Sequence, residues 1–268
     1  MSNLLEKAEA YSVLTSELSK KEHGALLCYP GVELKSFDPR TRQLRKLGVS
    51  ELILEGSSKI GRYGIVGKGC VSVVVRARLE TEKDPVALKI RRTDANRTDM
   101  KRDYALQSIA NSIGVGPKVI GVTKDLFAME YVEGQKLGTW TQSLNSRTSK
   151  RFTRGLIRSV LEQCYLLDSR GLDHGELSNP TKHVLVSGDF RKPRSTIIDY
   201  ESASLERRVS NLTAVAQFFL LGGWQSEKIR KIIGLNGHST KELIRLLRRY
   251  KENPSEESIE ELLDYLEC

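Results

Sequence analysis

The residues best suited to bind a metal ion and a phosphate group lie in one stretch, from Leu172 to Ser204. A loop in this stretch carries His174 and Glu176, and a β-branched segment further along ends at Asp199. A carboxylate can bind magnesium, and it can also accept the proton of an attacking hydroxyl group. Two such acids brought together would suit phosphoryl transfer.

The elements predicted around these acids would bring them to one edge of a small sheet. Short strands are expected at 184–186 and 196–198, joined by a basic turn from Arg191 to Arg194. The apolar periodicity of residues 149–169 predicts a helix that stops at Gly171 and delivers the chain to the loop. Adjacent strands that each deliver an acid or amide to one edge can hold a metal ion and a phosphate.

A second group of candidates lies upstream, where the pattern becomes β from Tyr63 onward. Gly67 and Gly69 mark a tight turn before an alternating strand, and glycines let backbone amides approach a phosphate without interference from Cβ. Lys89 lies inside the apolar run Val86 to Ile90. A lysine buried in such a strand is costly unless it meets an anion, so we expect a negative group close to it.

The following segment, residues 98–109, is predicted to be helical and offers Asp99 and Asp103 as partners for Lys89. Asp103 is the better candidate, because it precedes Leu106 by three residues and Ile109 by six, on the face expected to pack towards the strand.

Two further strands are expected at 119–122 and 126–129, followed by an extended linker. Backbone groups near Glu130 and Val132 in this linker are candidates for hydrogen bonds to adenine. Beyond the linker the chain becomes helical. A β-rich part followed by an α-rich part predicts an α+β fold with two lobes.

The order of these features resembles the protein-kinase superfamily, and especially its atypical RIO-like branch. Within that branch the sequence is similar to archaeal predicted serine/threonine protein kinases, through His-Gly-Glu-Leu-Ser at 174–178 and Ile-Asp-Tyr-Glu at 198–201. The resemblance covers about residues 60–222. It implies a two-lobed kinase-like fold with an N-terminal α/β extension at 1–55, an N-lobe at 56–132 and a C-lobe at 133–268.

The resemblance also implies roles for individual residues in binding ATP with Mg²⁺ or Mn²⁺. Gly67 and Gly69 would cover the phosphates, and Lys89 would pair with the α and β phosphates while Asp103 holds it. Met129 would occupy the gatekeeper position, and Asp199 would bind the metal. The catalytic residues would be Glu176, Lys89 and Asp199.

The sequence departs from the kinase pattern mainly in the catalytic loop. Glu176 stands where kinases have an aspartate; it is also a carboxylate but longer by one methylene. The second metal ligand, normally an asparagine, falls at Thr181, and Asn179 or His183 could replace it; Asn179 is the better oxygen ligand for magnesium. Glu201 replaces a glycine and either supplies a ligand or faces solvent.

Ser210, which can begin the next helix, follows Asp199 by only eleven positions, so a long activation segment is not expected. The resemblance implies a protein substrate that carries serine or threonine. Two alternatives are a pseudokinase scaffold that binds nucleotide and a protein or RNA partner, and a small-molecule kinase. The second is disfavoured because the C-terminal part leaves little space for a large substrate-binding insert.

The bulk composition agrees with a globular protein of 268 residues, 39% of them hydrophobic, with a formal net charge of +9. The positive charge favours an RNA or ribosomal partner electrostatically. No signal peptide or membrane span is expected, and four widely spaced cysteines argue against zinc and disulfides, so we expect a cytoplasmic protein without a membrane partner.

The remaining segments are expected to be regular elements without a catalytic signature. These are a helix at 3–20, a strand at 25–28, a helix at 39–47, a strand at 49–54, helices at 210–221, 226–233 and 239–251, and a last helix up to Leu266 that begins with a capping box at 253–256 and has Pro254 as its first residue.

Overall fold

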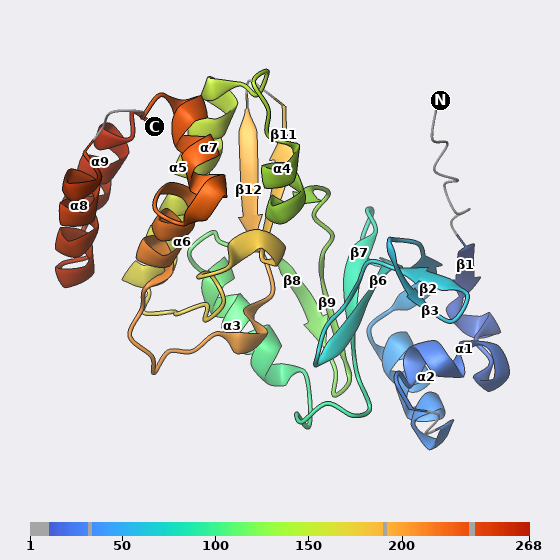
Figure 1. Cartoon of the computed structure of the whole chain (residues 1–268). Coiled ribbons are helices and arrows are strands. Elements are labelled where there is room, and N and C mark those ends of the chain that lie inside the picture. Colours follow the sequence, from blue (N-terminus) through green and yellow to red (C-terminus); the bar gives the residue numbers. More distant parts are fainter. Residues whose placement is uncertain (1–10, 32–33, 190–191, 236–238) are drawn as a thin grey trace, which may run out of the picture. The chain divides into compact units, whose positions relative to one another are not determined.

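The computed structural model describes residues 11–31, 34–189, 192–235 and 239–268 (Figure 1). The chain divides into two compact units, and each is described here by itself. The first unit comprises Met1–Ala105 and Lys118–Tyr131, and the second comprises Leu106–Pro117 and Val132–Cys268. Both contain strands and helices, so the predicted mixed α+β class is confirmed.

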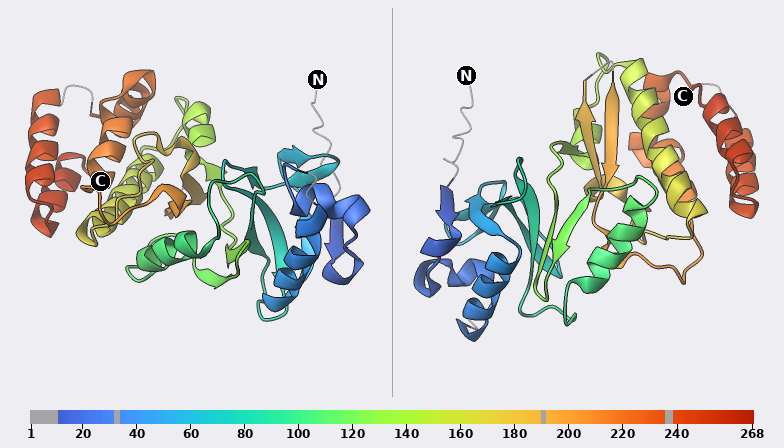
Figure 2. Two further views of the ribbon diagram at one scale, coloured as in Figure 1. Left: turned by 90° about the horizontal axis from the view of Figure 1, so that it is seen from below. Right: turned by 180° about the vertical axis from the view of Figure 1, so that it is seen from behind.

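The first unit is built on an antiparallel sheet of strand order β1-β2-β6-β7-β9-β8, with the short β5 paired to β6. The strands β3 and β4 form a separate hairpin. Helices α1 and α2 contribute to the same hydrophobic core as the sheet (Figure 2). The bounds are β1 Tyr11–Leu14, α1 Lys20–Leu27, α2 Phe37–Lys46, β2 Val49–Leu54, β3 Ser58–Ile60, β4 Tyr63–Ile65, β5 Gly67–Lys68, β6 Ser72–Leu79, β7 Val86–Arg91, β8 Val119–Val122 and β9 Leu126–Glu130, with 3₁₀ turns at Thr15–Glu17 and Leu34–Ser36.

Two predictions for the N-terminal segment are wrong. The predicted helix at 3–20 falls partly on residues 3–10, which lie outside the described residues, while 11–14 form strand β1 and pair with β2. The predicted strand at 25–28 is the end of helix α1, whose first turn is capped by the Ser19 side chain accepting from the Glu22 amide. A short apolar run fits a buried helix as well as a strand.

The other predictions in the N-terminal segment, α2 and β2, are confirmed, and α2 is anchored by a buried polar cluster. Arg40 of α2 is 1% exposed and lies 3.5 Å from Asp125 in the β8–β9 turn. Asp125 also accepts from Gln43 of α2 at 2.8 Å and from Arg91 of β7 at 2.6 Å. Burial opposes ionisation of Asp125, but the hydrogen bonds from Gln43 and Arg91 and the charge of Arg40 hold its pKa below its usual value. This cluster fixes the N-terminal segment to the strand that carries Lys89.

The second unit packs helices around a three-stranded antiparallel sheet, β10-β11-β12. The long helix α5 lies along β12 (Figure 2), and the side-chain amide of Gln163 bonds the backbone of that strand through the Ser195 carbonyl at 3.0 Å and the Ile197 amide at 3.2 Å. The bounds are β10 Gln135–Lys136, α4 Leu137–Ser143, α5 Lys150–Ser169, β11 Val184–Gly188, β12 Pro193–Ile197, α6 Asn211–Leu220, α7 Gly223–Ile233, α8 Thr240–Glu252 and α9 Glu256–Tyr265, with 3₁₀ turns at Pro180–Lys182 and Tyr200–Ser202.

Helix α3, Lys101–Asn111, begins in the first unit and ends in the second. The predicted strands and helices of the C-terminal part are found close to their expected positions. Part of the predicted basic turn, residues 190–191, lies outside the described residues.

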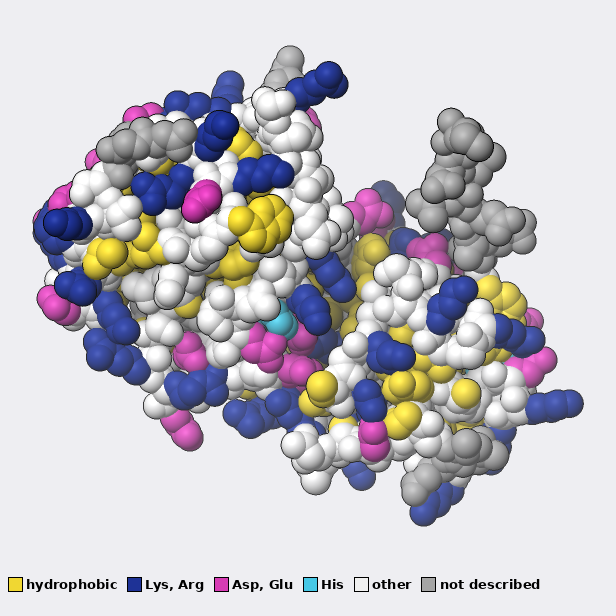
Figure 3. Space-filling view, in the orientation of Figure 1, with side chains coloured by type: hydrophobic (Ala, Val, Ile, Leu, Met, Phe, Trp, Pro, Cys, Tyr) yellow, Lys and Arg dark blue, Asp and Glu magenta, His cyan; other side chains and the backbone are white. Residues whose placement is uncertain are grey.

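The surface carries charges of both signs. On the face shown in Figure 3, Lys and Arg side chains lie over both units and are interspersed with acidic side chains. None of the helices within the described ranges combines the length and apolar character that a membrane crossing requires.

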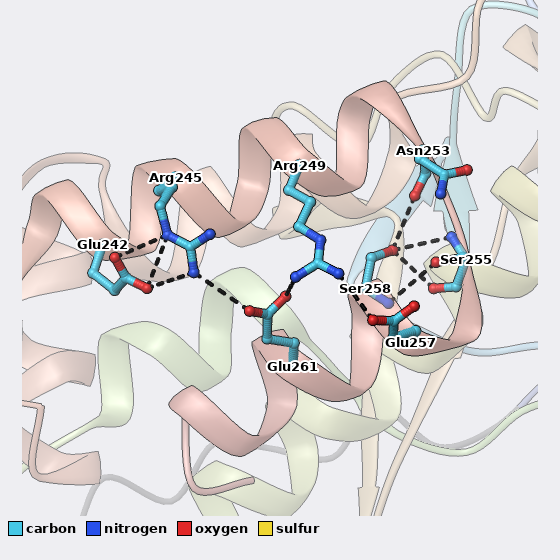
Figure 4. Close-up of polar contacts among 8 residues, drawn as sticks. All are labelled: Glu242, Arg245, Arg249, Asn253, Ser255, Glu257, Ser258 and Glu261. Carbon is cyan, nitrogen blue, oxygen red and sulfur yellow. Dashed lines mark hydrogen bonds and ion pairs between the residues drawn. The ribbon is translucent and has the colours of Figure 1, made fainter.

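An ion-pair ladder joins helices α8 and α9, and a capping box begins α9 (Figure 4). Arg245 pairs with Glu242 and Glu261, and Arg249 pairs with Glu261 and Glu257. The capping box predicted at 253–256 is wrong in its position: the helix begins instead with a capping box in which Ser255 is the N-cap and Ser258 its reciprocal partner. The prediction for Pro254 is wrong: it precedes the N-cap, and the first helical residue is Glu256.

The buried cluster around Asp125 generates a stability prediction. Asp125→Asn leaves Arg40 charged and buried without its carboxylate, so we expect the free energy of unfolding to fall by about 3–5 kcal/mol in urea titrations. Asp38→Asn is the matched control, because Asp38 lies on α2, as Arg40 does, but pairs with Lys20 at the surface, and its loss should cost less than about 1 kcal/mol. Equal losses in the two variants would contradict the proposed importance of the cluster.

Candidate functional site

In the second unit, the loop that carries Glu176 is held against the segment that follows β12. Asp173 and Ser204 form an isolated antiparallel bridge, with the Asp173 amide donating to the Ser204 carbonyl at 2.9 Å and the Ser204 amide donating back at 2.8 Å. Arg207 adds a 2.7 Å contact to the Asp173 carboxylate and a 2.6 Å bond to the Ser202 carbonyl. The two sequence motifs, at 174–178 and 198–201, therefore lie side by side.

Gly175, between His174 and Glu176, is required by this packing. Its φ of +88° belongs to the left-handed region, and a Cβ there would lie 2.7 Å from the Ser202 carbonyl oxygen. A larger residue would therefore strain the loop and push it away from the 198–204 segment.

Both carboxylate oxygens of Glu176 have partners within the unit. Oε2 lies 2.7 Å from His183 Nε2, and Oε1 accepts a hydrogen bond from the Ser202 hydroxyl. The Glu176 side chain is 35% exposed and His183 is 14% exposed. Glu176 is thus a held, partly accessible carboxylate that already accepts one hydroxyl group.

Asp199 occupies an unusual backbone conformation directly after β12. Its φ and ψ are both 73°, in the left-handed region, which is costly for a residue with a Cβ. The strain is supported on both sides: the Ile198 amide donates to the His183 carbonyl at 2.9 Å, and the buried Tyr200 ring packs against Gly116. Strained residues of this kind concentrate at functional sites, so Asp199 stays the leading candidate in this segment.

The buried His174 side chain connects the loop to the segment that follows β12. Its Nε2 bonds the Ile198 carbonyl at 3.1 Å, so this nitrogen carries the hydrogen, and its ring packs edge-on against Tyr200 at 5.1 Å. Burial, with a smaller contribution from the charge of His183, lowers the pKa of His174 to about 4, although the Ile198 bond and the charges of Asp199 and Glu176 oppose the shift. His174 is therefore a neutral structural side chain near neutral pH.

Asn211 and Asp168, which were not predicted as site residues, also hold the loop in place. The Asn211 side chain accepts from the His174 amide at 2.9 Å and donates to the Leu172 carbonyl and the Asp168 carboxylate, each at 2.8 Å. Asn211 begins helix α6 and Asp168 lies in the last turn of α5. The signal available in the sequence was an aspartate next to Leu167 of the apolar helix stripe, because a carboxylate buried there would need donors, but its partner could not be identified from spacing.

The candidate metal ligands differ in how they are already engaged. His183 is committed to Glu176, while the Asn179 side-chain oxygen accepts from the Thr181 hydroxyl at 2.7 Å. Asp199 and Glu201 are half-buried carboxylates on the adjacent segment. Among the described residues no group of three His, Cys, Asp or Glu side chains forms a metal cage. Magnesium bound together with phosphates needs only one or two protein carboxylates, so Asp199 with Asn179 or Glu201 suits it by the chemistry of the ligand atoms.

In the first unit, Lys89 lies in the middle of β7, paired with Val74 on one side and Phe127 on the other, and is 4% exposed. Asp103, in the first turn of α3, is 2% exposed and forms an ion pair with Arg97, which was not predicted. Asp99 accepts a hydrogen bond at 3.0 Å from the amide of Lys101, the first residue of α3, and so stabilises the start of that helix. The pairing of Lys89 with Asp103 stays a prediction.

The other predicted nucleotide contacts fall on β5, on β9 and after it. Gly67 lies in β5, and Gly69 begins the turn to β6, where its amide donates to the Ser72 carbonyl at 2.9 Å. Met129 is buried in β9. The Glu130 amide donates to the Lys118 carbonyl at 2.8 Å, and Val132 is the first residue of the second unit after the boundary.

Two surface depressions along α8, of about 400 and 370 Å³, contain none of the predicted site residues. They are open helix surfaces lined partly by Arg248, without the convergent acid and amide groups of the loop. We therefore place the candidate chemistry at the Glu176 and Asp199 segments.

The sequence matches none of the protein-family models and none of the curated proteins with which it was compared. The functional assignment therefore depends on the residues and their geometry, together with the resemblance of the motifs.

The lowered pKa of His174 generates a pH prediction. His174 has a pKa of about 4 in the native state and about 6.5 in the unfolded state, so between these values the unfolded state binds more protons. The free energy of unfolding is therefore highest above about pH 6.5 and falls as pH falls towards 4. Relative to His174→Gln, which keeps an N–H donor for the Ile198 carbonyl but cannot be protonated, the wild type should lose about 2–3 kcal/mol between about pH 7 and pH 4.5. Urea unfolding of metal-free protein measures this; parallel pH profiles would show that His174 is not the titrating group.

Proposed function

We propose that the protein is an ATP- and magnesium-dependent atypical serine/threonine protein kinase with a two-lobed kinase-like fold. The observation that supports the proposal is the bridge between two segments of the second unit, which holds the loop that carries Glu176 against the segment that carries Asp199, a residue with a strained backbone. Phosphoryl transfer depends on positioning and charge neutralisation, and this arrangement provides one acid for each task.

Glu176 is the proposed acceptor of the substrate hydroxyl proton, and Asp199 is the proposed magnesium ligand, with Asn179 or Glu201 as the second. Bound magnesium would neutralise charge on the phosphates. The Ser202 hydroxyl on Glu176 supports the first role, because it shows that this carboxylate can accept from a hydroxyl group.

The first unit supplies the proposed nucleotide contacts. Lys89 would pair with the α and β phosphates, and its burial supports this role because a buried ammonium group requires an anion. Within the described chain a Cβ at Gly67 would meet no atom within 4 Å and one at Gly69 only the Ser72 carbonyl, at 3.5 Å. No contact within the described chain excludes a side chain at these two positions. Glycine there is explained if a bound phosphate occupies the space next to the backbone.

The proposed adenine contacts follow Met129, the proposed gatekeeper. Because the Glu130 amide is already bonded to Lys118, an adenine contact by Glu130 would use its carbonyl group, and Val132 would contribute its backbone. Asp103 would hold Lys89.

The acceptor is proposed to be a serine or threonine of a protein, including this chain itself in autophosphorylation. The segment after Asp199 is short and its Arg207 is tied back to Asp173, so there is little chain available for peptide docking through an activation segment. An RNA or ribosomal partner, favoured by the net charge of +9, is part of the same proposal.

The first test is the transfer of labelled γ-phosphate from ATP with magnesium or manganese, following released phosphate and protein-bound label. Asp199→Asn removes the metal-binding charge and should reduce turnover by at least about 10²-fold while thermal unfolding stays cooperative. Asp189→Asn is the matched control, because this exposed acid lies at the other end of the same hairpin. Undiminished turnover in Asp199→Asn would refute the proposal.

A pseudokinase scaffold is the second candidate, and one observation favours it: both oxygens of Glu176 are occupied by side chains of its own unit. This candidate predicts that ATP with magnesium changes the melting temperature without any turnover. A ligand at about 100 times its dissociation constant stabilises the native state by about 2.7 kcal/mol, which is readily detected. Turnover that is sensitive to Asp199→Asn would exclude the scaffold.

A further inference from the structure

In the contact between His183 and Glu176, the donor and the acceptor can be assigned. Glu176 Oε2 is a carboxylate oxygen and can only accept while ionised, so His183 Nε2, at 2.7 Å, is the donor. The other ring nitrogen, Nδ1, is buried and has no hydrogen-bond partner in the described part of the chain. A hydrogen on Nδ1 would be a buried donor without an acceptor, so the Nε2–H tautomer is favoured.

The ring of His183 is fixed on several sides. Its backbone amide donates to the Pro180 carbonyl at 3.0 Å, and its carbonyl accepts from the Ile198 amide at 2.9 Å, which anchors the residue at the start of β11. Its ring lies edge-on to the buried His174 ring, with centroids 5.6 Å apart. His183 is therefore a more rigid element than the glutamate to which it donates.

A glutamate in this position needs such support. Its side chain has one more rotatable bond than aspartate, so more conformers must be excluded before its carboxylate is held in one orientation. The bond from His183 holds Oε2 and leaves Oε1 for hydroxyl groups, and in the described part of the chain it accepts from Ser202. Oε1 has lone pairs for a second hydroxyl donor.

We propose that His183 is a positioning residue that holds the Glu176 carboxylate through an Nε2–H bond, so that Oε1 faces the acceptor hydroxyl. The catalytic part of this inference rests on the proposed kinase function. In the transfer step the acceptor oxygen forms a bond to the γ-phosphorus of ATP, the bond from that phosphorus to the bridging oxygen breaks and ADP leaves, and the hydroxyl proton passes to Glu176. His183 keeps its hydrogen throughout. It is also removed from the candidates for the second metal ligand.

The contact itself is tested without reference to activity. Long-range ¹H–¹⁵N spectra of the ¹⁵N-labelled full chain at neutral pH should show His183 as the Nε2–H tautomer, assigned by the loss of its signals in His183→Gln. Glu176→Gln should shift the His183 signals more than those of the distant His23. A neutral Nδ1–H tautomer, or His183 signals that do not respond to Glu176→Gln, would overturn the inference.

The positioning role is tested by kinetics of the same full chain. His183→Leu should lower kcat by about 10- to 100-fold with little change in KM for ATP, because the carboxylate is misplaced while nucleotide binding is intact. His183→Gln should recover most of kcat, since its amide can donate from nearly the same place. Lys182→Ala, an exposed neighbour, is the control that should behave as wild type.

Wild-type kcat in His183→Leu, or equal losses in the leucine and glutamine variants, would overturn the positioning role. If His183→Leu does not fold, His183→Asn replaces it, because the shorter amide does not reach Glu176 and should show the same loss. A wild-type chain without any turnover would instead refute the proposed function and the catalytic part of this inference with it, while the spectra decide whether His183 holds Glu176.

Discussion

The second unit depends on one buried carboxylate, that of Asp168 at the end of α5. It accepts the backbone amides of Asn211 and Leu212 at 3.0 and 3.1 Å, the Asn211 side-chain amide at 2.8 Å and the Tyr250 hydroxyl of α8 at 3.0 Å. Asp168 thus caps the N-terminus of α6, where a negative group meets both orphan amides and the positive end of the helix. Burial raises its pKa despite these bonds.

Because Asn211 is shared between Asp168 and the loop, this cap also positions the candidate chemistry. The same side chain that bonds Asp168 accepts from the His174 amide, two residues before Glu176. The loop is therefore anchored to the helical core, and the 198–204 segment is anchored to the loop through the Asp173–Ser204 bridge. Functional side chains supported in this way by a rigid second layer keep their orientation.

A comparable cluster supports the first unit. Arg40, Gln43 and Arg91 all meet the Asp125 carboxylate, so a helix of the N-terminal segment and the strand that carries Lys89 share one anchor. The described part of the segment at 1–55, which carries no catalytic signature, thereby gains a structural role. It completes the sheet through β1 and β2 and fixes the β8–β9 turn beside β7.

Periodicity was sufficient to predict the regular elements in which it is strong, such as α5 and β6, and residue types were sufficient to predict which side chains could build a phosphoryl-transfer site. The sequence predictions failed in two places: Tyr11–Leu14, part of a predicted helix, pairs with β2 as a strand, and the short apolar run at 25–28 is the end of the helix that Ser19 caps, not a strand. Spacing also could not identify partners. The bond of Glu176 to His183, the cap on α6 and the Arg97 partner of Asp103 are side-chain contacts decided only by tertiary structure, because which donor meets a buried acid depends on how distant segments pack and not on local periodicity.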